Sequence, residues 1–222
     1  NEVKYRIKTG YLVGQMLEDA EVIGGASPNS IAIFDSYAYV TNATNDNIAV
    51  IDYKAGIIIK HIPIQVDSRI DKYRGYLPFG IEISKDGSTL YTALLGFNAV
   101  GVIDVKSSKT LGAIPTGWGP TRVKLSPNQK ELYIISARGF GAGPNGGENF
   151  IAPPQGTYIG DIQLATFQRL NVPDSALLGN YTKSVLSYTF IEEPIISSSN
   201  PMPYFPGEKQ SPIKYIVYIT KE

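Results

Sequence analysis

The chain contains 222 residues, with 20 basic and 20 acidic side chains, so its formal net charge is zero. This balance argues against a protein that wraps duplex nucleic acid, and no nucleic-acid partner is expected. Hydrophobic residues make up 43% and charged residues 18%, which predicts a folded chain with a sizeable core. No apolar run approaches the roughly 18 residues of a membrane span, so no span is expected. Cysteine is absent and His61 is the only histidine, which excludes Cys-ligated zinc, Cys–His nucleophiles and multi-histidine metal sites.

Both ends of the chain have strand-like patterns. Apolar and polar side chains alternate from Val3 to Ile7, which predicts a strand, and the basic start and apolar stretch of a secretory signal are lacking. Residues Ile213 to Thr220 form a second strand-like run. A chain that opens and closes inside strands is expected to be a segment of a larger protein.

Three segments of the chain follow one plan: residues 27–64, residues 77–117, and a third that starts at residue 119. The shared positions are a proline that opens each unit, a tyrosine 11 to 13 residues later, and in the first two units an aspartate 13 residues after the tyrosine. These residues are Pro28, Pro78, Pro120, Tyr39, Tyr91, Tyr133, Asp52 and Asp104.

Within each unit, short alternating strands are separated by turn residues such as Asp86-Gly87 and Pro127-Asn128. Four strands in roughly 40 to 50 residues is the size of a propeller blade, and such a blade buries its faces only by stacking on neighbouring blades. The pattern predicts an all-β protein, a β-propeller of four-stranded antiparallel blades. About three to four blades are expected over residues 1–173.

Tyr39-Val40-Thr41-Asn42, followed by a strand that ends in Val50-Ile51-Asp52, resembles the YVTN-repeat β-propeller family. The resemblance implies the strand order inner strand, YVTN strand, VID strand and outer strand. It also implies about seven blades in the whole propeller, with residues 1–24 supplying the last two strands of a preceding blade. A periplasmic or extracellular location is expected from this resemblance alone.

The third unit departs from the plan after its tyrosine. An insertion at residues 138–160 predicts a long surface loop, and residues 163–172 predict another strand. Asp174 is a plausible N-cap, and apolar residues at helical spacing follow it, so one short helix is predicted over residues 174–190. The proline-rich stretch 191–212 predicts an extended linker.

The tail is similar to one subgroup of the family, in which an alkaline-phosphatase-like phosphoesterase follows the propeller. The residues that carry this likeness are Gly143-Pro144-Asn145, Val172-Pro173-Asp174, Tyr181-Thr182 and Pro212 to Glu222. The resemblance implies that residues 213–222 form the first strand of the phosphoesterase, and that Glu222 helps to hold its divalent metal. One glutamate cannot form a metal site alone, so no cofactor is expected in this segment.

The inner strands supply the candidate ligand-binding residues. When the three units are aligned by their prolines, strand alternation places Glu82, Arg122 and Lys124 on one face, together with Ser30 and Gly80. One interpretation is a site in the propeller channel for an anionic group, with Arg122 as a bidentate clamp and Lys124 as a point charge. The other is a solvated channel in which the charges compensate one another.

Three functions follow from these observations. The first is a non-catalytic scaffold or binding module, part of a larger protein that carries a metal-dependent phosphoesterase. The second is a lactonase-like hydrolase with its site in the propeller, and the third is a cell-surface recognition propeller without enzyme activity. An incomplete propeller exposes open blade faces, so the missing propeller half or a second copy is an expected partner, beside an unidentified small-molecule or protein ligand.

Overall fold

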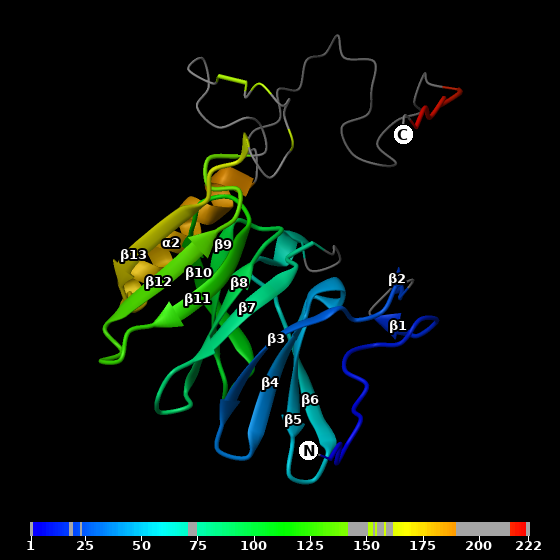
Figure 1. Cartoon of the computed structure of the whole chain (residues 1–222), viewed down its shortest axis with the longest axis vertical. Coiled ribbons are helices and arrows are strands. Elements are labelled where there is room, and N and C mark those ends of the chain that lie inside the picture. The colour runs from blue at the N-terminus through cyan, green and yellow to red at the C-terminus, as the bar shows by residue number, and fades with distance from the viewer. Residues whose placement is uncertain are drawn as a thin grey trace. The chain divides into compact units, whose positions relative to one another are not determined.

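The computed structural model describes residues 2–17, 20–22, 24–70, 75–141, 151–152, 154, 158, 162–189 and 214–220. The chain divides into two compact units, residues 1–189 and residues 190–222. All strands found among the described residues, and the helix α2, belong to the first unit (Figure 1). None of the described helices is both long enough and apolar enough to cross a membrane.

Three antiparallel sheets follow one another along the first unit, and their strands lie in the order of the chain (Figure 1). The first sheet contains β3 Pro28–Phe34, β4 Tyr37–Asn42, β5 Asn47–Asp52 and β6 Ile57–Pro63. The second contains β7 Pro78–Ile83, β8 Thr89–Leu94, β9 Ala99–Asp104 and β10 Lys109–Pro115. The third contains β11 Pro120–Leu125, β12 Glu131–Ser136 and β13 Thr166–Asn171.

The predicted all-β fold of propeller-type blades with one short helix is confirmed. Each repeat proline is the first residue of its inner strand, a position where the missing N–H of proline costs no ladder hydrogen bond. Asp52 and Asp104 end β5 and β9, as their place in the repeat predicted. The total of seven blades stays a prediction.

The three sheets stack through apolar faces. Inner strand β7 contacts inner strands β3 and β11 on its two sides. One core cluster fills the space between the first and second sheets and includes Tyr39, Ile81 and Leu90. A second cluster fills the space between the second and third sheets and includes Tyr91 and Val123. Each sheet therefore gains most of its burial from its neighbour, as expected for blades.

The close approach of β7 and β11 depends on Gly80. A Cβ atom placed on Gly80 would lie 2.5 Å from the backbone oxygen of Thr121 and 2.9 Å from the Cα atom of Arg122. Because both obstacles are backbone atoms, no side-chain rotation could relieve the clash. Glycine at this position lets the two inner strands come together and brings Arg122 next to the second sheet.

Helix α2, Ser175–Thr189, begins at the predicted N-cap, where the Asp174 carboxylate accepts a 2.8 Å hydrogen bond from the Leu177 N–H. The helix packs back on β10, the outer strand of the second sheet. Thr182 Oγ1 accepts a 3.0 Å hydrogen bond from Ala113 N–H and donates a 2.8 Å bond to the Leu178 carbonyl oxygen. A Cβ on Gly112 would meet this hydroxyl, so glycine allows the helix to sit close to the strand.

The predicted N-terminal strand over Val3 to Ile7 is wrong. The described part of residues 1–10 forms no strand, and only a short hairpin follows, with β1 Met16–Leu17 and β2 Ala20–Glu21. The segment packs instead by its side chains: Ile7 joins an apolar cluster on the first sheet, and the Tyr5 hydroxyl donates a 3.2 Å hydrogen bond to the Lys54 carbonyl oxygen. An alternating pattern produces a strand only where a neighbouring strand pairs with it.

Short 3-10 helices complete the first unit, η1 Ala43–Asn45 and η2 Ser68–Ile70. Most of the insertion 138–160, the linker 191–212 and Glu222 lie outside the described residues. Residues 214–220 are described, and they form neither helix nor strand. Their interpretation as the first strand of a following domain, and the domain boundaries as a whole, stay predictions.

Candidate functional site

Glu82, Arg122 and Lys124, called the inner-strand cluster below, lie on the inner strands β7 and β11, and the structure brings Glu82 and Lys124 into contact. Lys124 Nζ on β11 lies 2.6 Å from a carboxylate oxygen of Glu82 on β7, which makes an ion pair between the second and third sheets. The Lys124 side chain is 70% exposed and that of Glu82 only 17% exposed. An exposed pair of this kind stabilises a protein by at most about 1 kcal/mol. The two opposite charges compensate each other, as the solvated-channel interpretation requires.

Arg122 is the part of this cluster that the ion pair does not neutralise. Its Nη1 atom donates hydrogen bonds of 3.2 Å to Ser30 Oγ on β3 and 3.3 Å to the Thr121 carbonyl oxygen. The side chain therefore reaches from the third sheet to the first. In the described part of the chain its guanidinium forms no ion pair, and both of these hydrogen bonds use the Nη1 atom alone.

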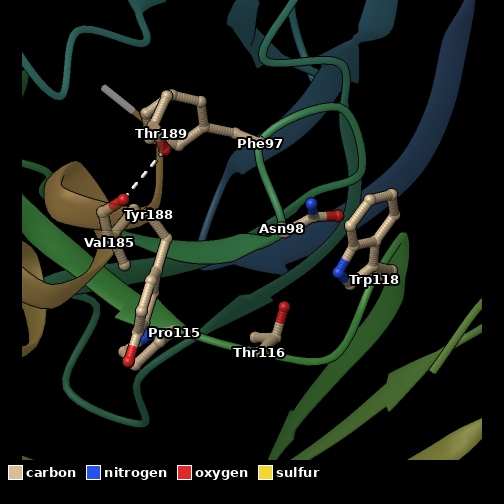
Figure 2. Close-up of a pocket in the computed structure, with 8 residues that line it drawn as sticks. All are labelled: Phe97, Asn98, Pro115, Thr116, Trp118, Val185, Tyr188 and Thr189. Carbon is tan, nitrogen blue, oxygen red and sulfur yellow. Dashed lines mark hydrogen bonds between the residues drawn. The ribbon is translucent and has the colours of Figure 1, made fainter. Parts of the chain in front are cut away.

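A pocket lies at the C-terminal end of β10, where the chain leads into β11 (Figure 2). Its volume is about 350 Å³. Aromatic and apolar side chains dominate the lining: Phe97, Asn98, Pro115, Thr116, Trp118, Val185, Tyr188 and Thr189. The helix supplies one wall and the loop between β8 and β9 supplies another. Sequence periodicity does not reveal this pocket, because its walls come from three separate parts of the chain.

A second pocket shares Asn98 and Trp118 with the first, and its volume is about 410 Å³. Its remaining lining residues are Leu77, Leu95, Gly96, Gly119, Ala137 and Arg138. Trp118 thus stands between two hollows, with half of its surface exposed. The single tryptophan of the chain was the one signal in the sequence that could have marked this place.

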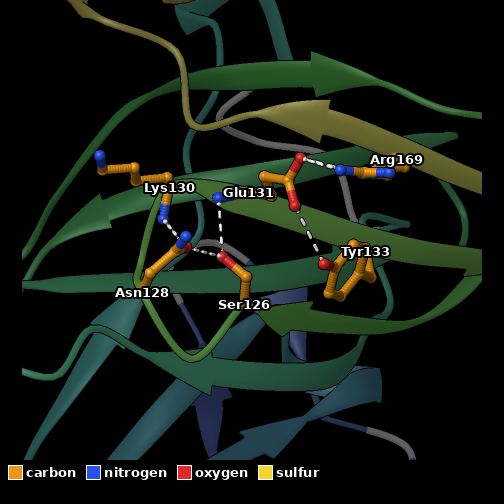
Figure 3. Close-up of polar contacts among 6 residues, drawn as sticks. All are labelled: Ser126, Asn128, Lys130, Glu131, Tyr133 and Arg169. Carbon is orange, nitrogen blue, oxygen red and sulfur yellow. Dashed lines mark hydrogen bonds and ion pairs between the residues drawn. The ribbon is translucent and has the colours of Figure 1, made fainter.

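A separate polar group lies on the third sheet, where Glu131 on β12 bonds to Arg169 on β13 (Figure 3). One Glu131 carboxylate oxygen accepts hydrogen bonds from Arg169, at 2.6 and 2.9 Å, and the other accepts one of 3.0 Å from the Tyr133 hydroxyl. The hydrogen bond from Arg169 lowers the pKa of Glu131, and the hydrogen bond to Glu131 raises the pKa of Tyr133. Each member of the group has its partner within the sheet, which indicates a structural role.

His61 lies in the outer strand β6 and is partly buried. Its ring lies 5.3 Å from the Tyr11 ring, and burial lowers the pKa of His61. Its Nε2 atom is buried without a hydrogen-bond partner in the described part of the chain. Among the described residues, no three His, Cys, Asp or Glu side chains are grouped closely enough to hold a metal ion.

Comparisons with known proteins give structural neighbours but no family. No family model matches the sequence. No curated protein matches it either. The solved structures that it resembles are β-propeller-like proteins. They include hydrazine synthase from Kuenenia stuttgartiensis, with 20% sequence identity and a TM-score of 0.44 over 58% of this chain and 33% of that one.

Two further neighbours are bacterial proteins with enzyme names. One is virginiamycin B lyase from Staphylococcus aureus, solved with quinupristin, with 20% identity and a TM-score of 0.41 over 53% of this chain and 38% of that one. The other is a proposed 6-phosphogluconolactonase from Bacteroides fragilis, with 20% identity and a TM-score of 0.43 over 53% of this chain and 34% of that one. The matched region spans about a third of the length of each of these structures.

Proposed function

We propose that this chain is a non-catalytic binding module of the propeller type, and that its inner strands hold an anionic group of a ligand or partner. The observation that carries the proposal is the state of Arg122. Glu82 and Lys124 neutralise each other, while the Arg122 guanidinium, where the inner strands meet, has no ion-pair partner among the described residues. A guanidinium fork with free donors matches the oxygens of a carboxylate or a phosphate.

The three candidate residues have different roles in this proposal. Arg122 binds the anionic group directly, while Ser30 holds the guanidinium by the 3.2 Å hydrogen bond to its Nη1 atom. Lys124 is paired with Glu82 at 2.6 Å, so this pair adds no net charge to the site and leaves the binding of the anion to Arg122. Because all of these groups lie on strands, the site is fixed by the sheets rather than by a loop.

The experiment compares two arginine variants in a calorimetric titration with inorganic phosphate and with an aspartate-rich peptide. Arg122→Gln should weaken the binding of at least one of these probes by roughly tenfold or more, because one charge-assisted hydrogen bond is lost. Arg6→Gln removes the same charge from the N-terminal segment and should leave the affinity unchanged. Equal affinity in all three proteins, or no binding of either probe to the unmodified chain, would overturn the proposal.

The larger context belongs to the same proposal and rests on the family resemblance. In it, the module precedes a metal-dependent phosphoesterase in an extracytoplasmic protein and positions a ligand for that enzyme, and Glu222 contributes to the metal site. The intact mass of the natural polypeptide and a phosphoesterase assay with added divalent metal test this part. A natural polypeptide of the chain's own mass, about 24.2 kDa, would contradict it.

A further inference from the structure

Trp118 is presented to solvent on a rigid backbone. Its N–H donates a 3.0 Å hydrogen bond to the Gly139 carbonyl oxygen, and its own carbonyl oxygen accepts a 3.0 Å bond from the Arg138 N–H. The next residue, Gly119, donates a 2.9 Å bond to the side-chain oxygen of Asn98. These bonds tie the start of β11 both to the loop between β8 and β9 and to the segment after β12. The backbone that carries the indole is therefore held in place, and half of the surface of Trp118 is exposed.

Single exposed aromatic side chains are common on protein surfaces and need no function. Trp118 differs because a hollow lies on each side of it, with volumes of about 350 and 410 Å³. Each of these volumes falls in the range of small-molecule sites, roughly 300 to 1,000 Å³. Phe97, Pro115 and Tyr188 line the first hollow, and Leu77 and Leu95 line the second. A flat ring placed on the indole would meet apolar surface on its other edges.

The polar side chains around Trp118 include the hydroxyls of Thr116 and Thr189 and the donor groups of Asn98 and Arg138. Among the described residues that line the two hollows, none is acidic. The side-chain oxygen of Asn98 already accepts the bond from Gly119, so the amide NH₂ is what remains for a ligand. Arg138 lies over Gly119, its Cγ atom 3.6 Å from where a Cβ of that glycine would be, and its guanidinium forms no ion pair within the described residues. The site offers hydrogen-bond donors and one positive charge, which favours a ligand with a negatively charged acceptor.

We infer that Trp118 and Arg138 form a binding site for a small aromatic carboxylate. The ring of the ligand stacks on the indole face, as offset aromatic pairs do. Its carboxylate receives the guanidinium of Arg138 and the amide NH₂ of Asn98, and such charge-assisted bonds give both affinity and orientation. This site is separate from the inner-strand cluster, since it uses neither Arg122 nor Lys124, and it adds a second ligand class to the proposed module.

The chain supplies its own probe for a test, because Trp118 is its only tryptophan and its emission reports on this site alone. The whole chain is titrated with benzoate, with benzyl alcohol, which has the ring without the charge, and with acetate, which has the charge without the ring. Benzoate should change the emission along a saturable curve. Each of the other two compounds should bind at least roughly tenfold more weakly, since each lacks one of the two contacts.

Two arginine variants then separate this inference from the proposed function. Arg138→Gln should reduce the affinity for benzoate to that for benzyl alcohol and leave the affinity for benzyl alcohol unchanged. Arg122→Gln should leave both affinities unchanged, because it alters only the inner-strand cluster. Trp118→Ala combined with Arg122→Gln, so that the inner strands no longer hold a carboxylate, should abolish the saturation-transfer NMR signal of benzoate. Equal affinity for benzoate and benzyl alcohol, or an Arg138→Gln variant that binds benzoate normally, would overturn the inference.

Discussion

The inner strands of the three sheets carry the same apolar position, yet its surroundings differ from sheet to sheet. Ile81 on β7 is 7% exposed and Val123 on β11 is 2% exposed, because each faces the preceding sheet. Ile31 on β3 occupies the equivalent place and is 58% exposed. The residue type is nearly constant, so the neighbouring sheet and not the strand itself supplies the burial.

The repeat tyrosines, on the opposite face of each sheet, also depend on a neighbouring sheet for their burial. Tyr39 and Tyr91 are buried against the following sheet, and burial raises the pKa of both phenols. Tyr133 lies on the outward face of the third sheet, where it stacks on Phe167 at 6.0 Å. There the hydrogen bond to Glu131 is the first cause of its raised pKa. The contrast teaches that a blade position acquires its physical properties from the blade beside it.

The largest expected effect comes from truncating the same position inside and outside the stack. Ile81→Ala leaves a cavity between two sheets and should lower the free energy of unfolding by about 2–4 kcal/mol. Ile31→Ala removes mostly exposed surface and should cost less than about 1 kcal/mol. Urea unfolding followed by Trp118 emission measures both. An equal cost for the two variants would show that the face of Ile31 is covered in solution. Light scattering over a dilution series would then show whether association of the chain provides this cover.

A middle-sized effect is expected from the buried threonines of the second strands. Thr41 Oγ1 donates a 2.7 Å hydrogen bond across to the Phe79 carbonyl oxygen of β7 and accepts one of 3.0 Å from the Ser30 N–H. Thr41→Val leaves both partners without a hydrogen bond and should lower the free energy of unfolding by about 1–3 kcal/mol.

Thr92→Val is the matched control. The Thr92 hydroxyl makes a single 3.2 Å bond to the Gly80 carbonyl oxygen, and both threonines are fully buried. Thr92→Val should therefore cost less than Thr41→Val in the same urea experiment. The reverse order would mean that bonds between sheets contribute no more than bonds within one.

The smallest effect concerns a turn that carries the carboxylate of Asp86 in the second sheet and the amide of Asn128 in the third. Hydrogen bonds from the Ser84 hydroxyl and from Ser88 lower the pKa of Asp86 from 3.8 to about 2. Asn128 accepts the corresponding bonds, 2.7 Å from the Ser126 hydroxyl and 3.1 Å from the Lys130 N–H. A lowered pKa means that the ionised form stabilises the fold above the unfolded value near 3.8, and that this contribution is lost as the pH falls toward 2.

Asp86→Asn should remove that acid-sensitive contribution, because it converts the second turn into a copy of the third. Stability measured in urea between pH 5 and pH 2 should then fall less steeply than in the unmodified chain. An NMR titration of the Asp86 carboxyl supplies the direct value. A midpoint near 4 would contradict the role assigned to the two serines.

Repeat spacing accounts for most of what could be predicted. The prolines begin the inner strands and the aspartates end β5 and β9, because each marks a point where the backbone changes direction. Strand alternation also placed Glu82 and Lys124 on one face, and they form an ion pair. These properties depend on local periodicity, which a sequence displays openly.

The failures share a different cause. The alternation of Val3 to Ile7 predicted a strand, but a strand also needs a pairing partner, which no local pattern reports. The seat of α2 on β10 depends on a contact between Gly112 and Thr182, and the hollows beside Trp118 need walls from β10, α2 and the loop before β9. Contacts between residues so far apart leave no periodic trace.

The amino-acid sequence by itself determined the repeat, the strand direction at each turn, the helix cap at Asp174 and the face on which each inner-strand side chain lies, because these follow from backbone geometry and short-range periodicity. Tertiary structure alone decided which equivalent residues are buried, which charges of the inner-strand cluster pair with each other, and where Trp118 stands between two hollows. The reason is that burial and charge pairing depend on what the neighbouring sheet presents.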